Sequence, residues 1–153
     1  MTTDDDFKQI NDAAAEFERK WYERSEEARR DISVRQRDKH AADGAVVPVL
    51  LFRAKKPTST DVQVTKHTFL VRVDQTFGEF VCTLRSTVRR GGGVREPWLR
   101  MRGDDSSMGL HYTVGKNTMP RHTATVGDLF REHQSDDGFL YVRFNAESTF
   151  GSA

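Results

Sequence analysis

The longest apolar stretch of the chain runs only from Ala45 to Phe52. A membrane-spanning helix needs about 20 apolar residues, so this stretch is far too short to cross a bilayer. It is rich in β-branched residues, which favours a buried strand. Pro48 has no backbone N–H, so it is expected at the strand start or at a sheet edge. The chain is therefore expected to fold around a short buried strand.

Helical and strand patterns alternate around this stretch. Apolar residues at steps of three and four from Phe7 to Trp21 predict one or two amphipathic helices over residues 5–38. Their stripe either packs on the rest of the domain or meets a partner or membrane. After the first strand we expect a polar loop over 53–66, a strand over 68–73, a helix over about 77–89, a strand over 110–114, a short helix ending at His133 and a strand over 139–144. This order suits an α+β fold, a ubiquitin-like β-grasp roll with an N-terminal helical extension.

Local motifs mark the ends of these elements. Thr76 precedes Glu79 by three residues, which is the spacing of a helix capping box. Thr125 or Thr123 is expected to cap the short helix. The sequence Asp136-Asp137-Gly138 is a turn signal just before the last strand.

Charge and cysteine content exclude several classes of function. Residues 1–43 carry 12 acidic and 9 basic side chains, residues 44–153 carry 15 basic and 11 acidic ones, and the net charge is +1. A general nucleic-acid binder usually has a clear basic excess, so nucleic acid is not an expected partner. Cys82 is the only cysteine, which excludes an internal disulfide and fits a reducing compartment. The N-terminus has no signal-peptide pattern, so a cytoplasmic protein is expected.

No cluster of residues predicts catalysis or metal binding. The five histidines include no pair with the spacing of a zinc protease, and Gly91 to Gly93 lack the residues of a phosphate loop. Cys82 is expected to be a small buried thiol near the apolar face of its helix. The arginines between residues 85 and 102 are interpreted as a solvated loop, with acidic lipid or nucleic acid as the alternative. We therefore expect no enzyme, no metal and no cofactor.

The C-terminal third carries a specific resemblance. The segments Asp128–His133, Asp136–Val142 and Glu147–Gly151 closely resemble the autophagy-related ubiquitin-like modifiers, the family of GABARAP and the light-chain-three proteins. Matches at family spacing continue upstream to Tyr22 and include Tyr22-Glu23-Arg24, Ile32, Val47-Pro48-Val49, Phe69-Leu70-Val71, Asp74, Thr76, Gly78, Phe80 and Arg85. The resemblance covers about residues 22–151.

The resemblance implies a domain organisation and a function. Residues 1–43 would form a helical extension packing on the roll, 44–151 the ubiquitin-like domain with a flexible insertion at about 89–109, and 152–153 a propeptide. A cysteine protease would cleave after Gly151, which Phe150 precedes. Activating and conjugating enzymes would then join Gly151 to phosphatidylethanolamine, and the protein would move from the cytoplasm to autophagosomal membranes. The small, polar tail suits passage through the active sites of these enzymes.

The resemblance also implies recognition of cargo receptors and adaptors. Family members bind an aromatic-x-x-aliphatic peptide as an added strand, here expected along residues 68–73. By position, one pocket would involve Ile32, Pro48, Leu70 and Phe139, with Lys66 near the acidic flank of the peptide. The other would involve Phe69, Val71, Phe80 and Leu84. The apolar pattern of these residues by itself is equally typical of the hydrophobic core.

The sequence also departs from the family. Arg72 replaces a usual proline, Gln75 a usual leucine and Thr68 a usual lysine, and extra residues follow Ile32 and Val88. Two alternatives stay open. One is a modifier conjugated to a protein lysine, and the other is a microtubule-associated binding module that uses the helical N-terminus and the arginine-rich loop.

Overall fold

The computed structural model describes residues 4–40, 45–55, 62–86, 88–90, 93–95, 97–101 and 108–148. Its helices are α1 (Asp4–Glu23), α2 (Glu26–Lys39), α3 (Phe77–Arg85) and α4 (Val126–His133). Its strands are β1 (Val46–Arg53), β2 (Val62–Val64), β3 (Thr68–Arg72), β4 (Val88–Arg90), β5 (Gly93–Arg95), β6 (Leu99–Met101), β7 (Met108–Val114) and β8 (Leu140–Ser148). Among the described residues, no helix has the length and apolar character needed to cross a membrane.

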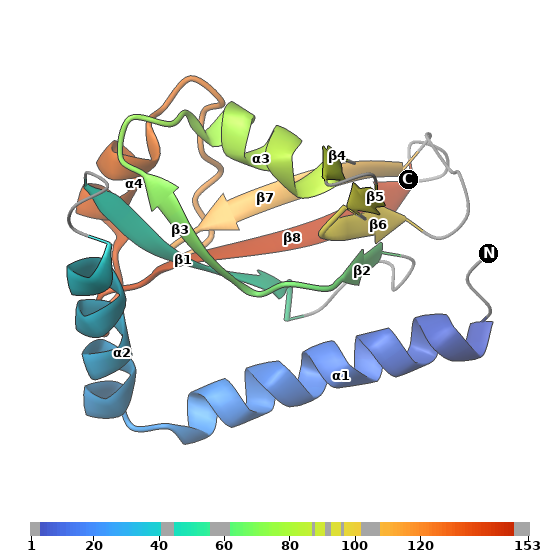
Figure 1. Ribbon diagram of the computed structural model, residues 1–153, viewed down its shortest axis with the longest axis horizontal. Coiled ribbons are helices and arrows are strands. Elements are labelled where there is room, and N and C mark those ends of the chain that lie inside the picture. Colours follow the sequence, from blue (N-terminus) through green and yellow to red (C-terminus); the bar gives the residue numbers. More distant parts are fainter. Residues whose placement is uncertain are drawn as a thin grey trace.

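A mixed sheet in the order β3–β1–β8–β7 forms the centre of the fold (Figure 1). The central strands β1 and β8 are parallel, whereas β3 and β7 run antiparallel to their neighbours. Helices α3 and α4 pack on one face of the sheet, and α1 and α2 lie against the other. This arrangement confirms the α+β, β-grasp class that the order of elements predicts.

Strand β1 is buried on both faces, which explains its almost continuous apolar sequence. Val47, Val49 and Leu51 belong to the larger core with α3 and α4. Leu50 and Phe52 belong to a smaller cluster on the side of α1 and α2. Pro48 lies near the strand start, ahead of the first residue that pairs with β8, so its missing N–H costs no ladder hydrogen bond.

The N-terminal segment forms two helices rather than one. They meet at Arg24 and Ser25, and the Ser25 hydroxyl accepts a hydrogen bond from the Ala28 N–H at 3.1 Å, which caps α2. Phe17 and Trp21 from the apolar stripe of α1 pack against the smaller cluster on the sheet. At these positions the stripe therefore contributes to the domain's own core.

The predicted caps of the later helices are present. The Thr76 hydroxyl accepts from the Glu79 N–H at 3.2 Å, and the Glu79 carboxylate accepts from the Thr76 N–H at 3.0 Å. This reciprocal pair is the expected capping box. Of the two candidates for the last helix, Thr125 is the cap, and its hydroxyl accepts from the Asp128 N–H at 3.2 Å.

Two predictions differ from the structure because strand pairing overrides the local pattern. The expected loop over 53–66 contains β2, which pairs with β6. The helix expected to reach residue 89 ends at Arg85, because Val88 pairs in β4 with Arg95. Within the stretch expected as a flexible insertion, the described residues include β4, β5 and β6.

The prediction of a buried Cys82 was wrong, because its side chain is exposed. The residues of α3 that face the core are Phe77, Phe80, Val81 and Leu84. At 100° per residue, position 82 falls on the opposite side of the helix from position 80. The thiol therefore points to solvent.

Candidate peptide-binding edge

Strand β3 forms one edge of the four-stranded sheet. Alternate residues of this segment form backbone hydrogen bonds with the antiparallel neighbour β1. The Leu51 N–H donates to the His67 carbonyl at 2.8 Å, and the Val73 N–H donates to the Ala45 carbonyl at 3.2 Å. In such a ladder the intervening residues direct their N–H and C=O groups away from the partner. Thr68 and Leu70 therefore present backbone donors and acceptors along the edge, and none of the described strands pairs with them there.

The structure brings the first predicted set of peptide-contacting residues together on the face of α2. Pro48 lies directly opposite Leu70 in the β1–β3 register. Phe139 immediately precedes Leu140, the partner of Val49, so it falls beside Pro48 on the neighbouring strand. Ile32 of α2 packs on the cluster that contains Phe139. Ile32 and Leu70 are half-buried, whereas Phe139 is only 1% exposed.

Phe139 is covered by Trp21 of α1. The two rings meet edge to face with centroids 5.1 Å apart, and Trp21 is 5% exposed. The Trp21 indole N–H donates to the Tyr141 hydroxyl at 2.8 Å. Sequence reasoning placed Trp21 in a packing stripe and missed that it forms the rear wall of this set. Only the tertiary structure brings it to Phe139, which lies far away in the chain.

A buried carboxylate holds this region in place. Asp137 accepts hydrogen bonds from the Phe139 N–H at 3.1 Å, from the Arg29 Nε at 3.0 Å and from the Tyr141 hydroxyl. Burial, and secondarily the hydrogen bond to Asp137, raises the pKa of Tyr141 far above its usual value. The network joins α2 to the start of β8 and thereby positions Phe139.

The turn before β8 requires glycine at position 138. Gly138 has φ +83°, and a Cβ there would lie 2.8 Å from the Ser33 Oγ. The Ser33 hydroxyl donates to the Gly138 carbonyl at 2.9 Å. This close contact is a second link between α2 and the start of β8.

The second predicted set lies in the interior. Phe69, Val71, Phe80 and Leu84 are each at most 7% exposed and belong to the larger core. The Phe69 and Phe80 rings meet edge to face at 5.4 Å. Of the two family departures near this set, Arg72 is exposed and bonded to Asp74 at 3.2 Å, and the Gln75 carbonyl accepts from the Val126 N–H at 2.8 Å.

Lys66, which is predicted to lie near the acidic flank of a bound peptide, lies against the second set. Its ammonium is 5.0 Å from the centre of the Phe69 ring and 4.3 Å from that of Trp98. Both contacts are within cation–π range. Strand alternation could not place Lys66, because it precedes β3, which begins at Thr68. Sequence reasoning did not assign Trp98 to the site, although a lone tryptophan in an arginine- and glycine-rich stretch was a usable signal.

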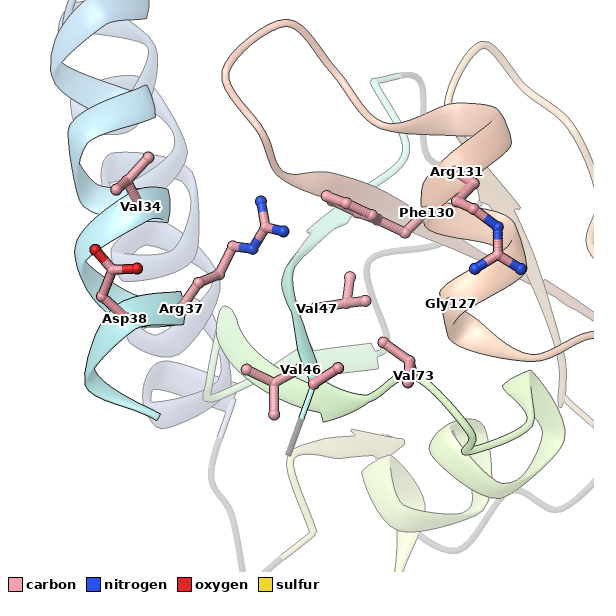
Figure 2. A pocket seen from close by; sticks show the side chains of 10 residues that line it. Val34, Arg37, Asp38, Val46, Val47, Val73, Gly127, Phe130 and Arg131 are labelled. Atoms are coloured by element: carbon pink, nitrogen blue, oxygen red, sulfur yellow. The ribbon is translucent and has the colours of Figure 1, made fainter. Parts of the chain in front are cut away.

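The structure also contains a hollow that no sequence motif predicted. Figure 2 shows it between α2 and α4, at the end of β3 and the start of β1. Its volume is about 590 Å³. The Arg37 guanidinium lies 5.5 Å from the Phe130 ring centre, and Val34 on the rim is 48% exposed. None of the residues predicted to contact a peptide lines it.

The remaining candidates for a functional role are His67, possible metal ligands and Gly151. His67 stacks on Phe17 with centroids 4.5 Å apart, its Nδ1 lies 2.9 Å from the Leu51 carbonyl oxygen, and burial lowers its pKa. Among the described residues, no group of three histidine, cysteine or acidic side chains is placed to hold a metal. Gly151 and Phe150 lie outside the described residues, beyond the end of β8 at Ser148.

Comparison with known proteins finds relatives that share one name, autophagy-related protein 8. The chain is 30% identical over 126 residues to autophagy-related protein 8a of Arabidopsis thaliana, which covers 82% of this chain and 87% of that protein. It is 27% identical over 124 residues to autophagy-related protein 8 of Dictyostelium discoideum, covering 81% and 86%. No model of a protein family matches the chain.

Solved structures agree with the fold. ATG8 of Trypanosoma brucei superposes with a TM-score of 0.60 at 22% identity, covering 84% of this chain and 93% of that one. Atg8 of Plasmodium falciparum, solved in complex with an Atg3 peptide, superposes with a TM-score of 0.59 at 24% identity, covering 82% and 94%.

Proposed function

This chain belongs to the Atg8 family of autophagy-related ubiquitin-like modifiers, and on that premise we propose that it is conjugated through Gly151 to phosphatidylethanolamine on autophagosomal membranes. Proteins of this family are modifiers rather than enzymes, so the chemistry at Gly151 is performed by partners. Those partners are a processing cysteine protease, which removes Ser152 and Ala153, an activating enzyme and a conjugating enzyme. The support is the relationship to the family together with the segment Glu147–Gly151.

Attachment of a two-chain lipid changes the membrane affinity of such a protein by a large amount. Each buried CH₂ contributes about 0.8 kcal/mol, and a single acyl chain gives only marginal, reversible binding, whereas two chains anchor stably. A protein with one lipid at Gly151 would therefore leave the cytoplasm and stay on the autophagosomal membrane. The described helices supply no membrane span of their own.

The second part of the proposal is recognition of cargo receptors and adaptors by strand addition. The observation that supports it is the edge of β3, where Thr68 and Leu70 direct backbone groups outward beside the apolar row of Leu70, Pro48 and Phe139. An added peptide strand obtains affinity from main-chain hydrogen bonds, and its aromatic side chain would contact the half-buried Leu70, which lies beside the already buried Pro48 and Phe139. Ile32 on α2 would form the opposite side.

A conjugating enzyme is also an expected partner. The Plasmodium relative was solved in complex with a peptide of Atg3 from the same organism. By analogy, we expect a segment of this chain's own conjugating enzyme to bind it.

One experiment tests conjugation. Wild type, Gly151→Ala and the control Met119→Ala, which removes an exposed side chain outside the segment Glu147–Gly151, are expressed in the native cytosol. Membrane and soluble fractions are compared before and after phospholipase treatment. Wild type and Met119→Ala should give a membrane-bound, phospholipase-sensitive form that Gly151→Ala lacks. A chain that ends at Gly151 should still form it without the protease.

The other outcomes decide between the alternatives. An unchanged membrane fraction in Gly151→Ala would contradict conjugation to lipid. A Gly151-dependent adduct of protein size would support a modifier of protein lysines. Salt-sensitive pelleting with microtubules that does not depend on Gly151 would support the microtubule-binding module.

A further inference from the structure

Trp98, just before β6, is fixed against the start of β3. Its carbonyl accepts from the Thr65 N–H at 3.0 Å, and the next residue, Leu99, pairs with Val64 of β2. Leu99 is 3% exposed and belongs to the larger core. Figure 1 shows the β2–β6 pair beside the end of α3, next to the start of β3. The backbone at the indole and directly after it is therefore fixed against β2.

The indole itself packs on the second predicted set. The rings of Trp98 and Phe69 meet at 5.1 Å with an interplanar angle of 62°. Behind Phe69 lie Phe80, Val71 and Leu84, all at most 7% exposed. An incoming aliphatic side chain gains affinity by covering apolar surface that is exposed in the free protein. These four side chains offer almost no such surface, because the chain's own residues already cover it.

We infer that Trp98 occupies the second anchor position from within the chain, so that the edge of β3 recognises partner peptides through a single aromatic anchor. This inference rests on the peptide docking proposed above and specifies its partner class. The expected ligand is an extended peptide with one aromatic side chain and no requirement for an aliphatic residue three positions later.

The charge at this end of the edge favours an acidic residue at that later position. The Lys66 ammonium, just before β3, lies over the Trp98 and Phe69 rings, whereas Arg72 at the other end of the strand is paired with Asp74. A carboxylate on the added strand would therefore meet Lys66. An aliphatic side chain at that position would lie against a charged surface, and the apolar side chains beneath it are already buried.

Main-chain pairing and the first set are unaffected by Trp98. Leu70 and Ile32 stay half-buried on the opposite face, and alternation along β3 separates them from Phe69. The aromatic anchor of the peptide should therefore dominate its affinity.

The test is a series of short labelled peptides titrated by fluorescence anisotropy into the full chain. The peptides are aromatic-x-x-Leu, aromatic-x-x-Ala, aromatic-x-x-Glu and Ala-x-x-Leu. In wild type we expect replacement of the leucine by alanine or glutamate to change Kd by less than about fivefold, and loss of the aromatic residue to weaken binding by more than about tenfold. A leucine-to-alanine effect above fivefold in wild type overturns the inference while peptide docking stands.

A variant tests the role of the indole directly. In Trp98→Ala the leucine peptide should bind more than about fivefold tighter than the alanine peptide, because a covered apolar site has opened. Trp98→Phe, which keeps an aromatic ring, should behave as wild type, and so should Met119→Ala, which removes an exposed apolar side chain elsewhere. A Trp98→Ala chain that folds, as judged by circular dichroism, but shows no preference for leucine contradicts the inference.

Failure of the underlying proposal gives a different result. If no peptide of the series binds wild type, docking along β3 is wrong and the inference falls with it. If Trp98→Ala does not fold, the wild-type series alone decides.

Discussion

Replacing Asp137 with asparagine should destabilise the protein more than any change to its exposed ion pairs. Asp137 is 1% exposed and accepts from Arg29, Tyr141 and the Phe139 backbone. Asparagine keeps the shape and one acceptor oxygen but removes the charge. Removing one partner of a buried ion pair costs about 3–5 kcal/mol, because the other charge is left uncompensated.

The expected cost here is lower because solvent reaches part of the ion pair. The Arg29 side chain is 16% exposed, so water can replace some of the lost interaction, and we expect a loss of about 2–3 kcal/mol. For a chain of this size that corresponds to a melting temperature lower by about 5–10 °C. The assay is thermal unfolding followed by circular dichroism.

A matched control removes an equivalent pair from the surface. Asp74→Asn breaks the contact with Arg72, in which both side chains are more than half exposed, and should leave the melting temperature unchanged. If Asp137→Asn melts within about 2 °C of the Asp74→Asn variant, the buried network does not stabilise the start of β8 as argued.

Three further predictions concern His67, Gly138 and Tyr112. Burial lowers the pKa of His67 below 6.5, so the unfolded chain takes up a proton more readily than the folded chain. Urea unfolding should therefore show that wild type loses stability below about pH 6.5 and that His67→Gln loses less. Equal losses in the two proteins would contradict this. Gly138→Ala should lower stability by about 1–3 kcal/mol in the same assay, because alanine at this φ is strained and its Cβ meets Ser33. The Tyr112 hydroxyl has no hydrogen-bond partner among the described residues, and burial raises its pKa to about 12. Tyr112→Phe should therefore keep or raise stability, by up to about 1 kcal/mol, and a clear loss would contradict this.

Local features of the fold could be predicted because the chemistry that creates them is local. The Thr76–Glu79 capping box needs only residues three apart, and the apolar run of β1 reports burial on both faces. The order of these elements was enough for the β-grasp class. The first set of residues predicted to contact a peptide, which was carried over by position in the family, also gathers on one face of the sheet.

Features that depend on contacts between distant segments could not be predicted. The strand β2 exists because β6 pairs with it, and the short run Val62–Val64 gives little signal by itself. The position of Lys66 depends on which face of β3 the Phe69 ring occupies and on the arrival of Trp98 from a later segment. Neither the β2–β6 pairing nor the position of Lys66 can be predicted from the local periodicity of the sequence.

The sequence by itself determined the class of the protein, the caps of its helices, the strand that forms its centre and its membership of the autophagy-related modifiers. Tertiary structure alone decided which surfaces stay open for partners. Both tryptophans pack on residues expected to contact a peptide, Trp21 on Phe139 and Trp98 on Phe69. An apolar residue in the sequence can be buried by the chain itself or stay exposed for a partner. Only the three-dimensional arrangement shows which apolar side chains are already covered.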